Sequence, residues 1–398
     1  METLLHEWLS LLFRWLHVIT GIAWIGSSFY FMWLDQSLRK HANLPAGAHG
    51  ESWSVHGGGF YHVQKYLVAP ERMPEELHWF KWESYMTWVS GFSLMAIVYY
   101  WGAESYLIDR SVMDISAGTA ILISIGSLVL GWVFYDLLCR SPLRDHSTVL
   151  FVILFAAIVA SAYGFSLVFS GRAAFVHVGA MVATMMSGNV FMVIIPNQKK
   201  VVAVLKAGGE PDPVYGKIAK LRSSHNNYLT LPVLFMMISN HYPMTFGHDW
   251  NWLIVAFVLA IGAIIRDFFN SHNAGMTGPA IQWQWPVVAV LMAGLVTLSA
   301  WKPGGEIQVD DDVYSSDAFA IVQTHCAACH SATPTSEDFD EAPGGVMFDT
   351  TDMMKRSGAR IMAQAVLSEA MPLGNMTGMT DDERAQLGAW IRAGMPDE

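Results

Sequence analysis

Long apolar runs fill the first 301 residues of this 398-residue chain, and they constrain its fold more than any other feature. A run of roughly 20 mainly apolar residues can cross the hydrocarbon core of a bilayer as a helix. Eight such runs occur, near residues 8–34, 77–100, 115–138, 149–169, 173–195, 228–241, 252–269 and 283–300. The sixth is short and contains Pro232, so seven or nine crossings remain open. We predict an all-α, polytopic membrane bundle of about eight transmembrane helices over residues 1–301.

Composition changes abruptly after this segment. From Lys302 onward the chain has 6 basic and 17 acidic residues, which leaves 17 of each before it out of totals of 23 and 34. The whole net charge of −11 therefore lies on the C-terminal segment. We predict a linker at 302–315 and a separate domain at 316–398. Its acidity suits a basic redox partner, although acidic surfaces also simply keep a domain soluble. We predict no nucleic-acid partner.

The C-terminal domain contains the motif Cys326-Ala327-Ala328-Cys329-His330. Cys-x-x-Cys-His is the attachment signature of a c-type haem, because two thiols on one turn can bond the two vinyl groups while the histidine faces the iron. Half a zinc site and a redox-active dithiol are the alternatives, but the chain has no second cysteine pair to complete a zinc site. We predict one covalent haem c on Cys326 and Cys329, with His330 as a metal ligand.

The second axial ligand is expected to be a methionine thioether, which raises the haem potential. Met371 is the best candidate, because Pro372 after it disfavours helix and would present Met371 from an extended loop. Met376, Met379 and Met395 are the other candidates, and any of the four could instead fill core space.

The sequence predicts the start of one helix near each end of this domain. Ser316 is a predicted N-cap, and Thr380 with Glu383 forms a predicted capping box ahead of Leu387 and Trp390. Residues 316–398 thus predict a small all-α class I cytochrome c domain, in which a covalent haem supplies apolar surface that so short a chain lacks.

The topology can be predicted from two features. A c-type haem is attached on the outer side of the bacterial inner (cytoplasmic) membrane, which places the C-terminal domain in the periplasm and, with eight crossings, the N-terminus as well. The loops then placed inside contain most of the basic residues, for example Arg140, Lys199 and Arg222, as the positive-inside rule requires. Met1–Arg14 lacks the features of a cleaved secretory signal, so the first helix should be retained.

An internal repeat is visible in the membrane segment. Leu16-His17-Val18 and the residues after it align without gaps to Val176-His177-Val178, and weaker matches follow in the same order, which predicts two parallel four-helix repeats. Ionisable groups inside a membrane are functional by default, so His17 and His177 are candidate ligands of a haem b in the membrane domain. The pattern around His17 resembles haem-binding membrane proteins such as bacterial protoporphyrinogen oxidases. Interhelical hydrogen bonding is the simpler alternative.

A set of polar residues falls at the predicted inner helix ends. Carboxylates, amides and phenols that converge between helices could form a pocket for a small polar substrate, although interfacial solvation and helix capping explain most of them equally well. The candidate substrate residues are Tyr85, Asn226, Asn227 and Tyr228, beside the carboxylates Glu83, Asp136 and Asp267. The loop 35–76 contains four histidines without the spacing of a known metal site, so we expect a folded or gating loop there.

The whole chain resembles the membrane-integral bacterial urate oxidases (urate hydroxylases), in which an eight-span domain precedes a cytochrome c domain. The resemblance rests on Arg14–His17 through Gly26–Phe31, on His56–Tyr61 and Lys81–Glu83, and on Cys326–His330 with Met371–Asn375. It implies oxidation of urate to 5-hydroxyisourate, with electrons leaving through the haem c to an acceptor such as a cytochrome c oxidase and without release of hydrogen peroxide. It also implies haem attachment at Cys326, Cys329 and His330 and an axial role for Met371.

For this reaction, Glu83, Asp136 or Asp267 could act as general base, since burial raises carboxyl pKa values toward neutrality. Two other classes of function remain open. The chain could be a quinol- or porphyrinogen-oxidising membrane dehydrogenase, or a non-catalytic electron-transfer subunit of a respiratory complex.

Overall fold

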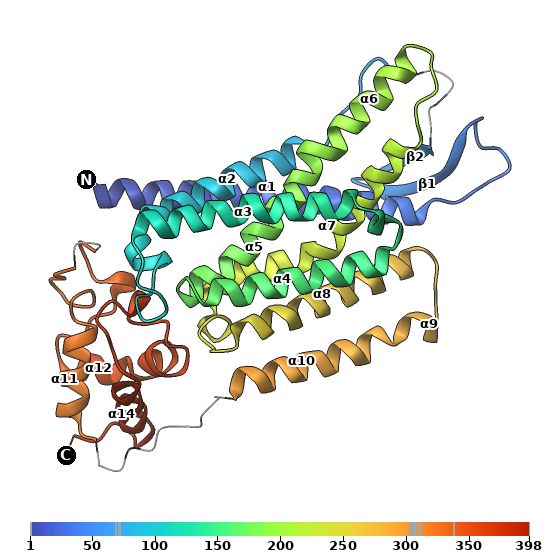
Figure 1. Ribbon diagram of the computed structural model, residues 1–398. Helices are drawn as coiled ribbons and strands as arrows, with labels where there is room; N and C mark the ends of the chain where they lie inside the picture. The colour runs from blue at the N-terminus through green and yellow to red at the C-terminus, as the bar shows by residue number, and fades with distance from the viewer. Residues whose placement is uncertain are drawn as a thin grey trace.

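The computed structural model describes residues 2–67, 70, 73–301, 309, 313–336 and 339–397. A bundle of long helices packs against a smaller helical domain at one of its ends (Figure 1). Most of the predicted linker at 302–315 lies outside the described residues.

Helices form at all eight predicted positions. Two of them are interrupted by π-helical turns: η1 (Ala96–Tyr100) continues α2, and η4 (Asn189–Ile194) joins α5 to α6. The helices of the bundle are α1 (Glu2–Ser37), α2 (Trp82–Met95), α3 (Ala117–Arg140), α4 (Ser147–Ser166), α5 (Gly171–Gly188), α6 (Ile195–Lys206), α7 (Val214–Ile238), α8 (Asn251–Asn273), α9 (Pro279–Gln282) and α10 (Gln284–Ala300).

Six helical stretches among the described residues are long and apolar enough to cross a membrane. They are α1, α3, α4, α5 with η4 and α6, α8, and α9 with α10. The other two predicted spans fall short for different reasons, because α2 is short and α7 carries buried polar groups such as Arg222 and Asn227. The chain is therefore mostly helical and compatible with a membrane protein.

Helix α5 lies at the centre of the bundle and contacts α2, α3, α4, α7 and α8. Small residues such as Ala173, Ala174 and Gly179 are buried along it, and small side chains let neighbouring helices approach closely. Helix α1, its partner in the predicted repeat, packs mainly against α2 and exposes much of its apolar surface. The two helices thus have similar sequences but different surroundings.

A β-hairpin interrupts the otherwise helical chain in the histidine-containing loop. Strands β1 (Ala48–His56) and β2 (Gly59–Tyr66) are antiparallel, with His56 opposite Gly59. Gly57 and Gly58 form the two-residue turn with φ of +58° and +79°, a conformation that glycine adopts without strain. The loop is folded as predicted, but the all-α prediction missed these strands, although a Gly-Gly turn between alternating residues is a hairpin signal.

The C-terminal domain is built from α11 (Ser315–His325), α12 (Thr351–Arg356), α13 (Gly358–Ile361), the π-helical turn η8 (Met362–Leu367) and α14 (Asp381–Arg392). Its core is centred on Val322, Met354, Leu387 and Trp390, all fully buried. The predicted capping box is confirmed, since Thr380 caps α14 and Glu383 bonds back to it. Helix α11 starts at Ser315 instead, with Tyr314 as its N-cap, so the N-cap lies two positions earlier than the predicted Ser316.

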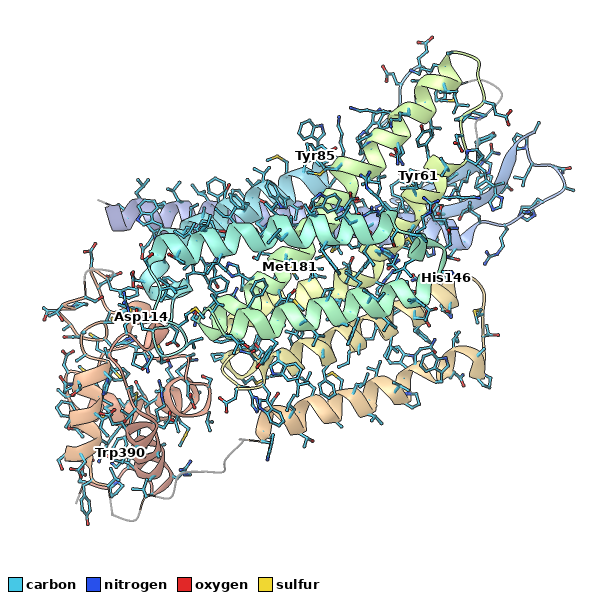
Figure 2. All side chains as sticks on the ribbon, viewed as in Figure 1. Tyr61, Tyr85, Asp114, His146, Met181 and Trp390 are labelled. Carbon is cyan, nitrogen blue, oxygen red and sulfur yellow. The ribbon has the colours of Figure 1, made fainter. Side chains whose placement is uncertain are left out.

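The C-terminal domain lies at the end of the bundle where α1, α3 and α5 begin (Figure 1). Contacts join η2 (Ala103–Leu107) to η9 (Leu373–Asn375). Figure 2 shows Asp114, just before α3, beside this domain, and His146, just after the 3₁₀ turn that follows α3, at the opposite end. We call these two ends the domain end and the far end.

Candidate functional site

The cysteine motif follows directly on α11. Residues 326–330 form a single turn closed by a hydrogen bond of 2.8 Å from the His330 amide to the Cys326 carbonyl. Both thiols therefore lie on one turn, as covalent attachment to a single porphyrin requires. Both cysteines are free and half-buried.

His330 is held in one orientation. Its Nδ1 is 2.9 Å from the Val346 carbonyl oxygen and donates to it, so the neutral ring carries its lone pair on Nε2. Phe348 packs beside the imidazole, with 5.4 Å between ring centroids. A metal-ligating histidine is commonly oriented by such a bond from its other nitrogen to a backbone carbonyl.

Met371 lies on a loop that packs against the core of the C-terminal domain. The Met371 amide donates to the Gln364 carbonyl at 2.9 Å, and the Met371 carbonyl accepts a hydrogen bond of 2.7 Å from Arg384. Met379 is buried in the core, whereas Met376 is 54% exposed. The loop around Met371 is thus anchored on both sides, which suits an axial ligand.

These residues fit a c-type haem better than they fit the two alternatives. A redox-active dithiol needs a thiol of lowered pKa, but burial raises the pKa of Cys326 to about 12. Within the described part of the chain, no group of three or more His, Cys, Asp or Glu side chains is placed to hold a metal ion. The turn offers two thiols and an oriented imidazole, which are the groups that a c-type haem uses.

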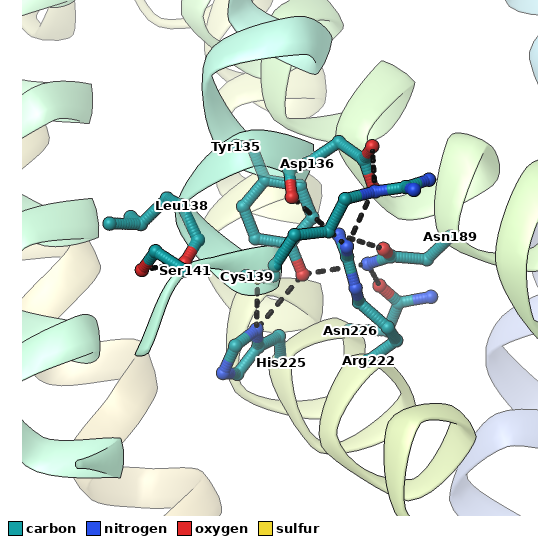
Figure 3. Close-up of polar contacts among 10 residues, drawn as sticks. Tyr135, Asp136, Leu138, Cys139, Ser141, Asn189, Arg222, His225 and Asn226 are labelled. Carbon is teal, nitrogen blue, oxygen red and sulfur yellow. Dashed lines mark hydrogen bonds and ion pairs between the residues drawn. The ribbon is translucent and has the colours of Figure 1, made fainter. Parts of the chain in front are cut away.

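The predicted inner polar residues lie toward the far end of the bundle, but they form two separate clusters. Figure 3 shows the contacts of the first, which we call the Asp136 cluster. It consists of Tyr135, Asp136, Arg140, Asn189, Arg222, His225 and Asn226, from α3, η4 and α7.

A buried ion pair is the centre of the Asp136 cluster. Arg222 is only 2% exposed and donates to Asp136 Oδ1 at 2.6 Å and to Asn189 Oδ1 at 3.2 Å. Its Nε has no partner among the described residues. Arg140 reaches the other oxygen of Asp136 at 2.7 Å from the surface. The carboxylate of Asp136 therefore already balances a buried charge.

Hydrogen bonds extend this cluster through buried side chains. The Tyr135 hydroxyl lies 2.9 Å from His225 Nδ1 and accepts a bond of 2.9 Å from Asn189. Asn189 also donates to Asn226 Oδ1 at 2.8 Å. Of the residues in this cluster, only Asp136 and Asn226 were predicted site residues; Tyr135 and Asn189 were missed.

The second cluster, which we call the Asp267 cluster, consists of Asn227, Tyr228, Arg266, Asp267, Asn270 and Gln284. Asp267 accepts bonds of 3.1 Å from both Tyr228 and Gln284. Arg266 donates to Asn227 at 2.6 Å and stacks on the Phe29 ring. Neighbouring Asn226 and Asn227 thus serve different clusters.

Glu83 and Tyr85 belong to neither cluster. Glu83 lies in the first turn of α2 and has one buried carboxylate oxygen without a partner among the described residues. Tyr85 packs edge-on against Phe191 at 5.0 Å. The structure therefore does not bring Glu83, Asp136 and Asp267 together through any hydrogen bond or ion pair among the described residues.

The two candidate haem b ligands differ in their contacts. His177 is fully buried, and both of its ring nitrogens are engaged, with the Ala173 carbonyl at 2.7 Å and the Ser124 hydroxyl at 2.6 Å. His17 uses Nδ1 toward the Thr87 carbonyl and the Ser90 hydroxyl. His177 would have to break a hydrogen bond before it could bind iron, and a membrane haem b stays a prediction.

Most of the chain matches the model of a known protein family. The model of the urate oxidase N-terminal family matches residues 3–300, about three quarters of the chain. This chain belongs to the urate oxidase N-terminal family. Membership links the helical bundle to urate and to oxidoreductases. Among curated proteins and solved structures, no similar one was found. The family match stops just before the C-terminal domain, so the cytochrome interpretation rests on the residues around Cys326 and His330.

Proposed function

We propose that the chain oxidises urate to 5-hydroxyisourate and passes the electrons to a c-type haem on its own C-terminal domain. The observation that carries this proposal is the oriented His330 beside two thiols on one turn, in a domain that contacts the bundle. The family match supports urate as the substrate. Together they support a polypeptide that combines an electron acceptor site with a urate-related domain.

We further propose eight crossings, with the C-terminal domain in the periplasm. Supporting this, helices form at all eight predicted positions, and α1 begins at the domain end (Figure 1). The short α2 and the polar α7 would cross inside the bundle, since both contact the central α5. The N-terminus and the C-terminal domain would then share one side of the membrane.

The reaction has a simple balance. The urate monoanion and one water molecule give 5-hydroxyisourate, one proton and two electrons. A bound c-type haem would supply an acceptor that takes one electron at a time. The residues of this chain must therefore hold the purine through two successive transfers, exclude competing reactions and accept a proton. Glu83, Asp136 and Asp267 remain the predicted bases. The final electron acceptor is a periplasmic or membrane protein such as a cytochrome c oxidase, and no hydrogen peroxide forms.

Steady-state turnover of the purified, membrane-extracted protein tests this proposal. With urate as donor and oxidised soluble cytochrome c as acceptor, we expect urate loss, acceptor reduction and no hydrogen peroxide. Reduction by a quinol or a porphyrinogen but not by urate would support a different dehydrogenase. Acceptor reduction that requires a further respiratory subunit would support a non-catalytic electron-transfer role. A haem assay under denaturing conditions separates covalent haem c from extractable haem b.

A further inference from the structure

A cavity of about 730 Å³ lies between the domain end of the bundle and the C-terminal domain. We call it the junction cavity. One wall comes from the bundle, including Asp109, Arg172 and Phe246, and the other comes from the C-terminal domain, including Glu369, Leu373 and Arg384. Its volume is in the range of pockets that bind small molecules. The junction cavity contains none of the residues of the Asp136 or Asp267 clusters.

The two walls are in direct backbone contact, so the cavity has fixed borders. Gly374 has a φ of +53°, and a Cβ there would lie 2.6 Å from the Ile108 carbonyl oxygen. A Cβ on Gly247 would collide with the Ser368 carbonyl. Both glycines allow an approach that a side chain would prevent. The C-terminal domain is therefore docked closely enough to form one wall of the cavity.

Arg172 gives the cavity a cation without a counter-ion. It lies on the first turn of α5, is half-buried, and its guanidinium is 5.4 Å from the centroid of the Phe246 ring. Within the described ranges, no carboxylate pairs with it. Arg384, the other arginine of the cavity, is engaged by the carbonyls of Ala365 and Met371. A partly desolvated cation without a counter-ion favours an anionic ligand.

The remaining lining suits a flat molecule with several N–H and C=O groups. Tyr106, Tyr163 and Phe246 contribute aromatic side chains, which stack on planar rings. Asp109, Asp249, Glu369 and Asp381 contribute carboxylates that accept N–H donors, and three of them, Asp109, Glu369 and Asp381, act on Arg384. A urate anion has these features: a planar purine, ring N–H groups, carbonyl oxygens and one negative charge.

The position of the junction cavity relative to Met371 favours this cavity over the far end of the bundle as the site of the electron donor. Ala370 and Leu373 line the cavity on either side of the loop that contains Met371. Asp136 lies 19 residues after Ala117, the start of α3, so the Asp136 cluster is roughly 30 Å further along the helix at 1.5 Å per residue. Electron transfer through protein slows steeply with distance, so a donor in the junction cavity is far better placed to reduce a group bound at Met371 and His330.

We propose that the junction cavity binds the purine substrate as its anion, with Arg172 as the residue that pairs with the negative charge. This inference rests on the proposed function and assigns its substrate site to the domain end of the bundle. It also removes Glu83, Asp136 and Asp267 as general bases, because none of them lines the cavity. Urate then binds from the side of the membrane on which the C-terminal domain lies.

Direct binding of radiolabelled urate to the dithionite-reduced full-length protein tests the assignment, because the reduced protein cannot oxidise its ligand. The variants are Arg172→Gln and Arg172→Lys, and the matched control is Arg110→Gln. Arg110 is an exposed arginine at the same end, pairs with Glu104 and Asp114, and does not line the cavity. The haem spectrum and the thermal midpoint of each variant show whether it has folded.

We expect Arg172→Gln to weaken urate binding roughly ten- to a hundred-fold, the effect of losing one charge-assisted hydrogen bond. Arg172→Lys should lose less, and Arg110→Gln should bind like the unmodified protein. The KM for urate should rise in the same order. Unchanged binding by both Arg172 variants, while the unmodified protein binds and oxidises urate, would overturn the site but leave the proposed function intact. Failure of the unmodified protein to bind or oxidise urate would overturn the proposed function itself.

Discussion

Substitution of Asp136 by alanine should destabilise the helical bundle strongly. The change removes the carboxylate that pairs with Arg222 at 2.6 Å, and Arg222 is almost fully buried. Breaking a buried ion pair by removing one partner typically costs about 3–5 kcal/mol, because the remaining charge is left uncompensated. Asn189 still accepts one bond from Arg222, so we expect about 3 kcal/mol. Loss of the bond from Arg140 adds little to this cost, because the Arg140 side chain is 67% exposed.

The free energy of unfolding, measured by SDS titration of the protein in mild detergent micelles, checks this value. Asp145→Ala is the matched control, since Asp145 is 75% exposed and lies 3.8 Å from Arg144, and it should change stability by no more than about 0.5 kcal/mol. The double variant Asp136→Ala with Arg222→Leu should recover part of the loss. A cost of Asp136→Ala below about 1 kcal/mol would refute the reasoning.

Three further outcomes follow from the structure. Gly262→Ala should cost about 1–3 kcal/mol in the same titration, because the new Cβ would meet the rigid Pro232 ring at 2.6 Å; no loss would mean that α7 and α8 pack less tightly. In the C-terminal domain, the hydrogen bond from the Thr380 backbone amide lowers the pKa of the Glu383 carboxylate to about 2. The contribution of this carboxylate to folding stability is therefore full above its usual pKa of 4.5 and disappears as the pH falls to about 2. Glu383→Gln should therefore destabilise at pH 7 and not near pH 2, as unfolding at the two pH values would show; equal losses would contradict this. Met371→Ala should keep the covalent haem but lose the methionine–iron charge-transfer band, and an unchanged band would exclude Met371 as a ligand.

Features set by neighbouring residues were predictable from the sequence. The haem motif needs only five consecutive residues, and the structure folds them into one turn. The capping box at Thr380 also depends only on local spacing and is confirmed. Apolar runs gave the positions of the bundle helices, because their length and hydropathy are properties of each segment alone.

Contacts between distant segments could not be read from the sequence in the same way. Asp136 and Arg222 are 86 residues apart, and only helix packing shows that they form a pair. The junction cavity takes residues from both the bundle and the C-terminal domain, so no single motif marks it. One missed signal was available: Arg222 and Asn226 are four residues apart on α7, and that spacing puts two polar groups on one buried helix face.

Anaerobic titration of the fully oxidised, purified protein with urate tests the central claim most directly. Urate gives two electrons and a c-type haem accepts one, so we predict that each urate molecule reduces the covalent haem of two chains. Omission of urate, or its replacement by allantoin, should give no reduction. A protein without covalent haem, or a covalent haem that stays oxidised when excess urate is added, would contradict the account.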